Sequence, residues 1–272
     1  MDGKILPRLS LHHLTVIDAT PLELVELARE TGCQHVCFFV CMPKSVRERY
    51  PIVRSADIER LRGALQRSGI SVFNLEVFPI SHDITPGELE KGIALGAALG
   101  GCHATVHVHI EDRVTAIPLF RDFCAMTAER NIKVGLEYNG FSAIRSPFEA
   151  SNFLNNANCS NAGIVADLLH TARSGAGPPE LAALQSQIDY VQISDGPMEI
   201  PADRRWREAL SERLLPGAGE LPLRAMLAAL ADDIVIDIEV PRLSASSAGI
   251  SRYKRVHEAV KATRKLLVSG PN

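Results

Sequence analysis

Eight short apolar segments recur along this chain at intervals of roughly 30 residues, and each is followed by an amphipathic segment. The apolar segments are rich in residues that favour strands, and they span residues 9–14, 35–40, 72–78, 105–110, 133–138, 163–168, 190–193 and 234–240. The amphipathic segments have the spacing of helices and span residues 22–29, 58–67, 89–99, 118–130, 148–156, 181–187, 223–231 and 253–267. Strict alternation of strand and helix predicts parallel pairing through right-handed crossovers. Eight such units predict a closed (β/α)₈ TIM barrel.

Three of the helix starts carry the same local signal, in which Ser or Thr is followed by Pro and, three residues on, by Glu. The signal occurs as TPLE at residues 20–23, TPGE at 85–88 and SPFE at 146–149. Each is a capping box with proline at the first helical position, where its missing N–H has no cost. These sites are therefore predicted to begin helices.

The 272 residues match the roughly 250 residues of one such barrel, so we expect a single domain over residues 1–272. A lid-like insertion with a helix of its own is expected at about 196–220, which exceeds the usual connection length. It contains Arg204, Arg205, Trp206, Arg207 and Arg213. The alternative, an open doubly wound sheet, is disfavoured because the turn at residues 14–18 lacks a glycine-rich phosphate loop.

Composition excludes several classes of function. A net charge of -3 with scattered Lys and Arg gives no field for a phosphate backbone, so we expect no nucleic-acid partner. No apolar run reaches the roughly 20 residues of a membrane span, and we expect a cytoplasmic protein. Six cysteines without a CxxC pair predict buried thiols rather than a disulfide framework. The sequence leaves open whether the chain forms a homo-oligomer.

Strand alternation predicts which polar side chains point into the barrel. In residues 234–240 the even positions are aliphatic, which places Asp237 and Glu239 inside. The same reasoning directs Glu137, Asp167 and Gln192 inward from the three preceding strands. Three buried carboxylates in one concavity require a cation, and oxygen ligands suit Mn²⁺ or Mg²⁺ better than Zn²⁺. Solvated carboxylates at the rim are the alternative, which explains any one residue but not four on successive strands.

Further polar residues are expected to contact a substrate. His170 follows Asp167 by three residues, and Arg173 lies beyond it in the same loop. His109 alternates with apolar neighbours and lies near the rim, while Glu76 shares an interior phase with Asn74. Alternatively, His109 is a buried histidine of the core, and Glu76 is the partner of a neighbouring histidine. Active sites of this barrel lie at the carboxyl ends of the strands, which favours substrate contacts for His170 and Arg173 and leaves both interpretations open for His109 and Glu76.

The sequence resembles the sugar phosphate isomerase/epimerase family, whose members have a xylose isomerase-like TIM barrel. The resemblance covers nearly the whole chain and is carried by LEV at residues 75–77, LEY at 136–138, NAGIVADLLH at 161–170, YVQISDG at 190–196 and IEV at 238–240. It implies one divalent metal ion held by Glu137, Asp167, Gln192 and Glu239. It also implies that the two glutamates act as acid and base. Most of the family has histidine where this chain has Gln192.

The activity implied is an isomerase or epimerase acting on a keto sugar or related polyol. Proton abstraction next to a carbonyl would proceed through a metal-stabilised enediolate, with Glu137 and Glu239 as the catalytic pair. A dehydratase of an inosose-like or dehydroshikimate-like cyclic ketone would use the same site. An apurinic endonuclease is disfavoured, because residues 201–205 read PADRR where that branch needs a D-x-H motif. A non-catalytic binding protein is the remaining alternative, for which Gln192 is the one indication.

Overall fold

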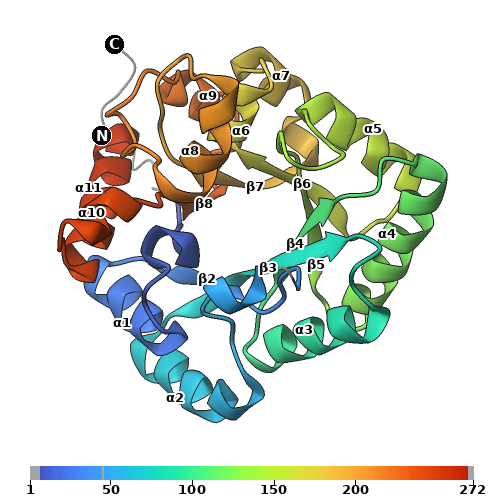
Figure 1. Ribbon diagram of the computed structural model, residues 1–272, viewed down its shortest axis with the longest axis horizontal. Helices are drawn as coiled ribbons and strands as arrows, with labels where there is room; N and C mark the ends of the chain where they lie inside the picture. Colours follow the sequence, from blue (N-terminus) through green and yellow to red (C-terminus); the bar gives the residue numbers. More distant parts are fainter. Residues whose placement is uncertain (1–6, 45, 269–272) are drawn as a thin grey trace.

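The computed structural model describes residues 7–44 and 46–268, in which eight parallel strands close into a barrel (Figure 1). Each strand pairs with the next one along the chain, and the last pairs with the first. The strands are β1 (Leu9–His12), β2 (His35–Phe39), β3 (Ser71–Ile80), β4 (His103–Val108), β5 (Lys133–Glu137), β6 (Ala162–Asp167), β7 (Ile188–Ile193) and β8 (Val235–Ile238). The eight predicted strands and the predicted TIM barrel are confirmed.

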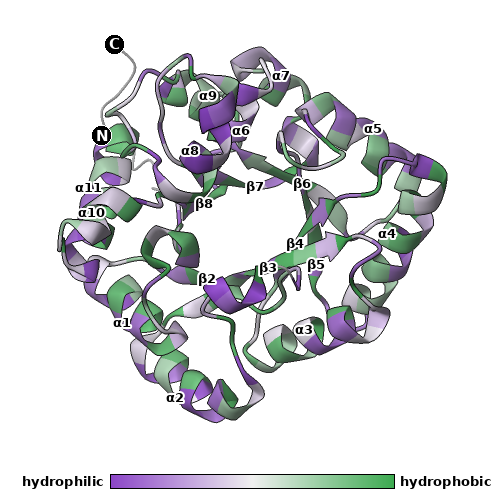
Figure 2. Cartoon of the chain, in the orientation of Figure 1, coloured by the Kyte–Doolittle hydropathy of each residue, from purple (hydrophilic) through white to green (hydrophobic). Residues whose placement is uncertain are grey.

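Helices surround the barrel as an outer ring (Figure 1). They are α1 (Pro21–Thr31), α2 (Ile58–Ser68), α3 (Pro86–Ala98), α4 (Arg113–Ala128), α5 (Pro147–Ala157), α6 (Leu168–Arg173), α7 (Pro178–Ala183), α8 (Arg205–Ser211), α9 (Leu223–Ala228), α10 (Leu243–Ser247) and α11 (Arg252–Val268). Hydrophilic and hydrophobic residues alternate along them (Figure 2), as expected for helices with one face on the strands. Within the described ranges, no helix is both long and apolar enough to cross a bilayer.

Short 3₁₀ helices fill several connections, namely η1 (His13–Val16), η2 (Arg47–Arg49), η3 (Ser55–Asp57), η4 (Gln185–Gln187) and η5 (Ala202–Arg204). The predicted helix at residues 181–187 is divided between α7 and η4. The start predicted for α4 at residue 118 is wrong, since this helix begins at Arg113 and Pro118 lies inside it. The Asp112 carboxylate caps α4 by accepting the N–H groups of Val114 and Thr115. An aspartate alone can start a helix, and no Ser/Thr-Pro-x-Glu signal marks this one.

The interior of the barrel is packed in layers, with apolar side chains below and polar side chains nearer the carboxyl ends of the strands. Phe73, Val165, Tyr190 and Val235 form a buried cluster inside the barrel, with the rings of Phe73 and Tyr190 edge to face at 5.1 Å. A layer of polar residues lies closer to the carboxyl ends of the strands. The sheet register places Asp167 beside Gln192, and Gln192 beside Asp237. The predicted inward phase of these three residues is confirmed, and all are fully buried.

The connection between β7 and β8 crosses the mouth of the barrel, and its predicted helix is present as α8. Asp195 holds the return of this connection, since its carboxylate accepts the N–H groups of Gly217, Gly219 and Leu221. Glu208 of α8 forms an ion pair of 2.6 Å with Arg173. The β7–β8 connection is therefore folded back onto its own start at Asp195 and is joined to α6 through Glu208 of α8.

The capping boxes are complete at Thr20 and Thr85, where hydroxyl and glutamate exchange hydrogen bonds with the opposite backbone N–H. At Ser146 the hydroxyl accepts from the Glu149 N–H, but the Glu149 carboxylate accepts instead from the Arg145 N–H. We expect Thr20→Ala to lower the free energy of unfolding by about 1 kcal/mol, because the N–H of Glu23 loses its partner. Urea unfolding measures this, with Thr20→Ser as the control that keeps the hydroxyl. Equal stability of both variants would contradict a capping role.

Candidate active site

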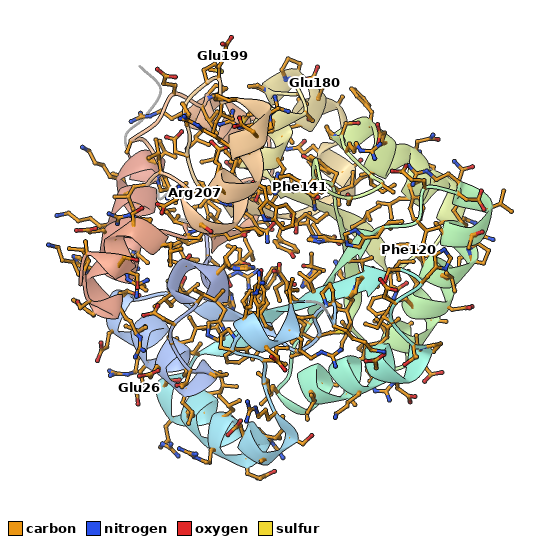
Figure 3. The ribbon with its side chains drawn as sticks, in the orientation of Figure 1. Glu26, Phe120, Phe141, Glu180, Glu199 and Arg207 are labelled. Carbon is orange, nitrogen blue, oxygen red and sulfur yellow. The ribbon has the colours of Figure 1, made fainter. Side chains whose placement is uncertain are left out.

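A cavity of about 920 Å³ opens at the carboxyl ends of the strands. Its walls come from the ends of β1 to β5 and of β8, from α6 and from α8. Two aromatic side chains stand at its mouth, where the Phe141 and Trp206 rings meet edge to face at 4.7 Å and both remain exposed. Figure 3 shows Phe141 near the middle of the ring of strands, whereas Glu26 and Glu180 lie at the periphery.

The predicted ligand residues are buried together in this region. Asp167 and Glu239 contact the same guanidinium, that of Arg213, at 2.6 and 3.0 Å respectively. Glu137 and Asp167 also form a group with His170 in which one donor atom of each lies within 4.8 Å of the others. Gln192 lies beside Asp167 in the sheet register. The four side chains that alternation directs inward therefore meet at one end of the barrel.

Arg213 is the residue that the sequence places only within the lid-like insertion. It is buried, and besides the two carboxylates it donates to the Ser194 hydroxyl and the Ala209 carbonyl. The sequence around Arg213 has neither the alternation of a strand nor the spacing of a metal-binding motif, so no local pattern distinguishes it from the other arginines of the insertion. The sequence gives only an indirect indication of this role for Arg213. Three buried carboxylates require a positive charge nearby, and an arginine of the insertion can supply it.

The buried charges change the acidity of the site. Burial raises the pKa of Glu239 to about 8, although Arg213 and His12 oppose this, and the negative charges of Asp167 and Glu76 add to it. Burial also disfavours the charged form of Asp167, but Arg213 and His170 together hold its pKa below the ordinary value. The Asp167 oxygen Oδ1 caps α6 by accepting two backbone N–H groups, which favours the carboxylate further.

Three histidines lie around Glu137 and the cavity. His107 Nε2 lies 3.0 Å from Glu137 Oε2, and His170 Nε2 lies 4.0 Å from Glu137 Oε1. Burial lowers the pKa of His107, but the carboxylates of Glu137, Glu76 and Glu239 together more than offset this and raise it overall. His109 lines the cavity as predicted, and burial with the nearby His107 lowers its pKa to about 4. His109 is therefore a neutral ring at neutral pH.

Two other predicted substrate contacts have their polar atoms occupied. Arg173 is not among the residues that line the cavity; its guanidinium donates to Glu208 and to the carbonyls of Pro197 and Met198. Glu76 does line the cavity, but its oxygens accept bonds from buried side chains. These contacts indicate that Arg173 fastens the β7–β8 connection to α6. They indicate that Glu76 positions neighbouring side chains.

The residues at the site fit a divalent cation. Gln192 Oε1 and Glu239 Oε2 are buried oxygen atoms without a hydrogen-bond partner in the described structure. Buried oxygens normally have a partner. Carboxylate and amide oxygens are donors for Mn²⁺ and Mg²⁺, and His170 adds a nitrogen donor that Mn²⁺ also accepts. Glu137, Asp167, Gln192 and Glu239 therefore have the donor types that such a cation takes, and Arg213 already supplies one positive charge beside them.

Comparison with known proteins agrees with this geometry. The family model described as xylose isomerase-like TIM barrel matches residues 25–265, so the chain belongs to the xylose isomerase-like TIM barrel family. The predicted family is thereby confirmed. No curated protein sequence matches the chain significantly.

Solved structures with the same fold are distant in sequence. An IolI protein with a bound zinc atom is 17% identical with a TM-score of 0.75, and the match covers 96% of each chain. The D-allulose 3-epimerase from Methylomonas sp. is 15% identical, with a TM-score of 0.72 and coverage of 96% of this chain and 98% of that one. The probable 3-DHS dehydratase AsbF from Bacillus anthracis is 13% identical, with a TM-score of 0.74 and coverage of 94% and 98%. At these identities the likeness shows the fold alone.

Loss of Arg213 tests the charge balance of the site. We expect Arg213→Met to lower the free energy of unfolding of the metal-free protein by about 3–5 kcal/mol, because the buried Asp167 carboxylate loses its counter-charge and Glu239 loses a hydrogen-bond donor. Urea unfolding in the presence of a chelator measures this. The matched control is Arg207→Met, which removes an exposed arginine of α8 and should change stability by less than about 0.5 kcal/mol. Equal stability of the two variants would show that Arg213 does not balance these charges.

The raised pKa of Glu239 predicts a pH dependence of stability. Between the ordinary pKa of 4.5 and about 8, the folded protein keeps a proton that the unfolded chain has released. Because the folded state then binds more protons, the free energy of unfolding of metal-free protein should fall as pH rises across this window. Unfolding curves at a series of pH values measure the slope. Glu239→Gln should flatten it, and an unchanged slope in that variant would assign the effect to another group.

Proposed function

We propose that this protein is a divalent-metal-dependent isomerase or epimerase that moves a proton next to the carbonyl of a keto sugar or related polyol. The observation that carries the proposal is the meeting of Glu137, Asp167, Gln192 and Glu239, with the carbonyl of Gln192 and one oxygen of Glu239 buried and unpartnered. These four residues would hold the metal ion, Mn²⁺ or Mg²⁺. The bound ion would act as a Lewis acid on the oxygens of the substrate.

Glu137 and Glu239 are the proposed acid and base. They follow the ends of β5 and β8, which two other strands separate on the barrel, and both line the cavity. One carboxylate would take the proton from carbon and the other would return a proton. Asp167 has one oxygen engaged by backbone N–H groups and the other by Arg213, so it is suited to a fixed supporting role.

The substrate would lie in the 920 Å³ cavity, between these carboxylates and the aromatic pair at the mouth. His109 and His170 line the cavity and offer ring nitrogens to hydroxyl groups. Phe141 and Trp206 would shield the site from water, which strengthens electrostatic interactions inside it. A keto sugar or cyclic polyol has the mixture of hydroxyl groups and apolar ring face that this lining suits.

A dehydratase acting on a cyclic ketone is the second candidate, and the positive charges of the cavity favour it. Lys44 and Arg49 lie in the cavity wall, and both side chains are exposed. Two cationic side chains suit a substrate that carries a carboxylate, such as a dehydroshikimate-like ring. The same base would remove the proton, and an acid would then protonate the departing β-hydroxyl group. The probable dehydratase of this fold named above is consistent with such a reaction.

Solvent isotope exchange tests the shared first step. We expect the protein, supplied with Mn²⁺ in D₂O, to incorporate deuterium next to the carbonyl of its substrate. A panel of keto sugars, inososes and carboxylated cyclic ketones, followed by NMR, identifies the reacting compound and separates epimerisation from loss of water. Glu137→Gln and Glu239→Gln should each reduce exchange by roughly 10²–10⁴-fold, because each removes a proton-transfer group.

The control is Glu199→Gln, which changes an exposed carboxylate of the β7–β8 connection at the periphery (Figure 3). Its exchange rate should equal that of the unmodified protein. Turnover that keeps the original hydrogen in full would indicate a hydride shift between carbons. That result would refute the proton-transfer mechanism, while a protein that turns over none of the compounds and binds no metal would refute the enzyme assignment.

A further inference from the structure

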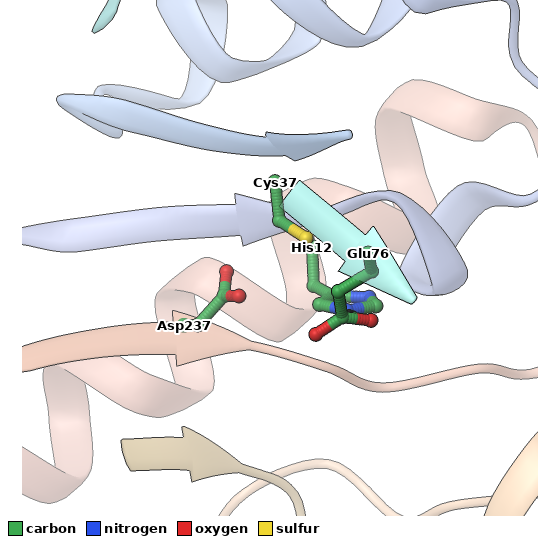
Figure 4. A group of neighbouring side chains, drawn as sticks. All are labelled: His12, Cys37, Glu76 and Asp237. Atoms are coloured by element: carbon green, nitrogen blue, oxygen red, sulfur yellow. Dashed lines mark hydrogen bonds and ion pairs between the residues drawn. The ribbon is translucent and has the colours of Figure 1, made fainter. Parts of the chain in front are cut away.

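Glu76 lies at the centre of a buried hydrogen-bond network beneath the proposed metal site. Its Oε2 atom lies 2.6 Å from His12 Nε2, a pairing shown in Figure 4. Its Oε1 atom accepts from Asn74 Nδ2 at 2.8 Å and from Gln192 Nε2 at 2.9 Å. Glu76, His12, Asn74 and Gln192 are each at most 3% exposed. Neither oxygen of Glu76 therefore lacks a partner.

The direction of each bond in this network follows from one backbone group. The N–H of Leu14 donates to His12 Nδ1 at 3.0 Å, so this nitrogen must carry a lone pair. The ring hydrogen that faces Glu76 lies on Nε2, which donates it to Glu76 Oε2. Glu76 accepts this bond and the two amide bonds, and an ionised carboxylate can do nothing but accept.

This fixed direction determines which end of the Gln192 amide faces the site. If the amide were rotated by 180°, its carbonyl oxygen would face the carboxylate of Glu76, and two acceptors would repel each other in a buried position. The amino group must therefore face Glu76. The carbonyl oxygen Oε1 is then directed away from Glu76, and it is the buried atom without a partner in the described structure.

We propose that Glu76 is a positioning residue, which holds the Gln192 side chain so that its carbonyl oxygen is presented to the cation. This inference rests on the metal site proposed above. It sets two requirements on position 192, namely an N–H donor toward Glu76 and a lone pair toward the ion. Glutamine meets both requirements. Histidine, which the family resemblance leads one to expect here, also meets both.

Metal affinity tests the proposal without any substrate. Metal-stripped protein is titrated with Mn²⁺ by calorimetry, and with Co²⁺ by its visible absorption spectrum. Glu76→Gln should weaken binding by roughly 10–100-fold, as for other residues that orient a metal ligand. It should also change the Co²⁺ spectrum, because the new side chain has both a donor and an acceptor and the Gln192 amide can rotate. The fold of each variant is checked by circular dichroism.

A double-mutant cycle separates orientation from charge. In a Gln192→Leu background, Glu76→Gln should have no further effect on the affinity, because the oriented ligand is already gone. An equal loss in both backgrounds, or no loss from Glu76→Gln alone, would overturn the proposal. The matched control is Asp237→Asn, which removes a second buried carboxylate within 4.8 Å of Glu76, since no hydrogen bond joins Asp237 to Gln192 in the described structure. Its effect should be much smaller than that of Glu76→Gln.

Variants at position 192 give an answer even if Glu76→Gln does not fold. Gln192→His should keep affinity of the same order, because an imidazole has a donor and a lone pair. Gln192→Glu should bind Mn²⁺ no more tightly than the unmodified protein, since its carboxyl can donate to Glu76 only after taking up a proton and losing its charge. Tighter binding by Gln192→Glu would overturn the proposal. An unmodified protein that binds neither ion would overturn the metal site itself.

Discussion

Compensation of buried negative charge is the constraint on which this site depends. Glu76, Glu137, Asp167 and Glu239 are all buried close to one end of the barrel, where water cannot solvate them. In the described structure the His12 imidazole donates to Glu76, His107 Nε2 lies 3.0 Å from Glu137 Oε2, and the Arg213 guanidinium pairs with both Asp167 and Glu239. Among the four proposed ligand residues, two buried oxygens have no hydrogen-bond partner in the described structure, Gln192 Oε1 and Glu239 Oε2, and oxygen atoms of this kind bind divalent cations.

The fold and the inward-facing residues can be predicted because both follow from short-range periodicity. Alternation of apolar and polar residues along β8 directs Asp237 and Glu239 inward, and the structure buries both. Parallel pairing then brings the ends of neighbouring strands together without further information from the sequence. The same reasoning locates Glu137, Asp167 and Gln192, since each lies in or at the end of a strand with a clear phase.

Residues of the connections cannot be placed in this way, because a loop has no phase. The sequence indicates Arg213 only as one of several arginines at residues 196–220, yet it is the one that reaches the carboxylates. Arg173 is expected beside the substrate, whereas Glu208 and two backbone carbonyls occupy its guanidinium. Which arginine pairs with which carboxylate depends on contacts between distant parts of the chain. No local pattern contains that information.

The attachment of Arg213 to the connection rather than to a strand has a consequence for protein engineering. In this fold, specificity is commonly altered by exchanging the loops that follow the strands, on the assumption that the barrel itself is indifferent to them. Here the loop after β7 carries the cation that two barrel carboxylates share. A transplanted loop would have to bring its own positive charge to the same depth. The loop after β7 and the barrel each hold one half of this charge pairing, so a redesign of either must keep the charges of the other balanced.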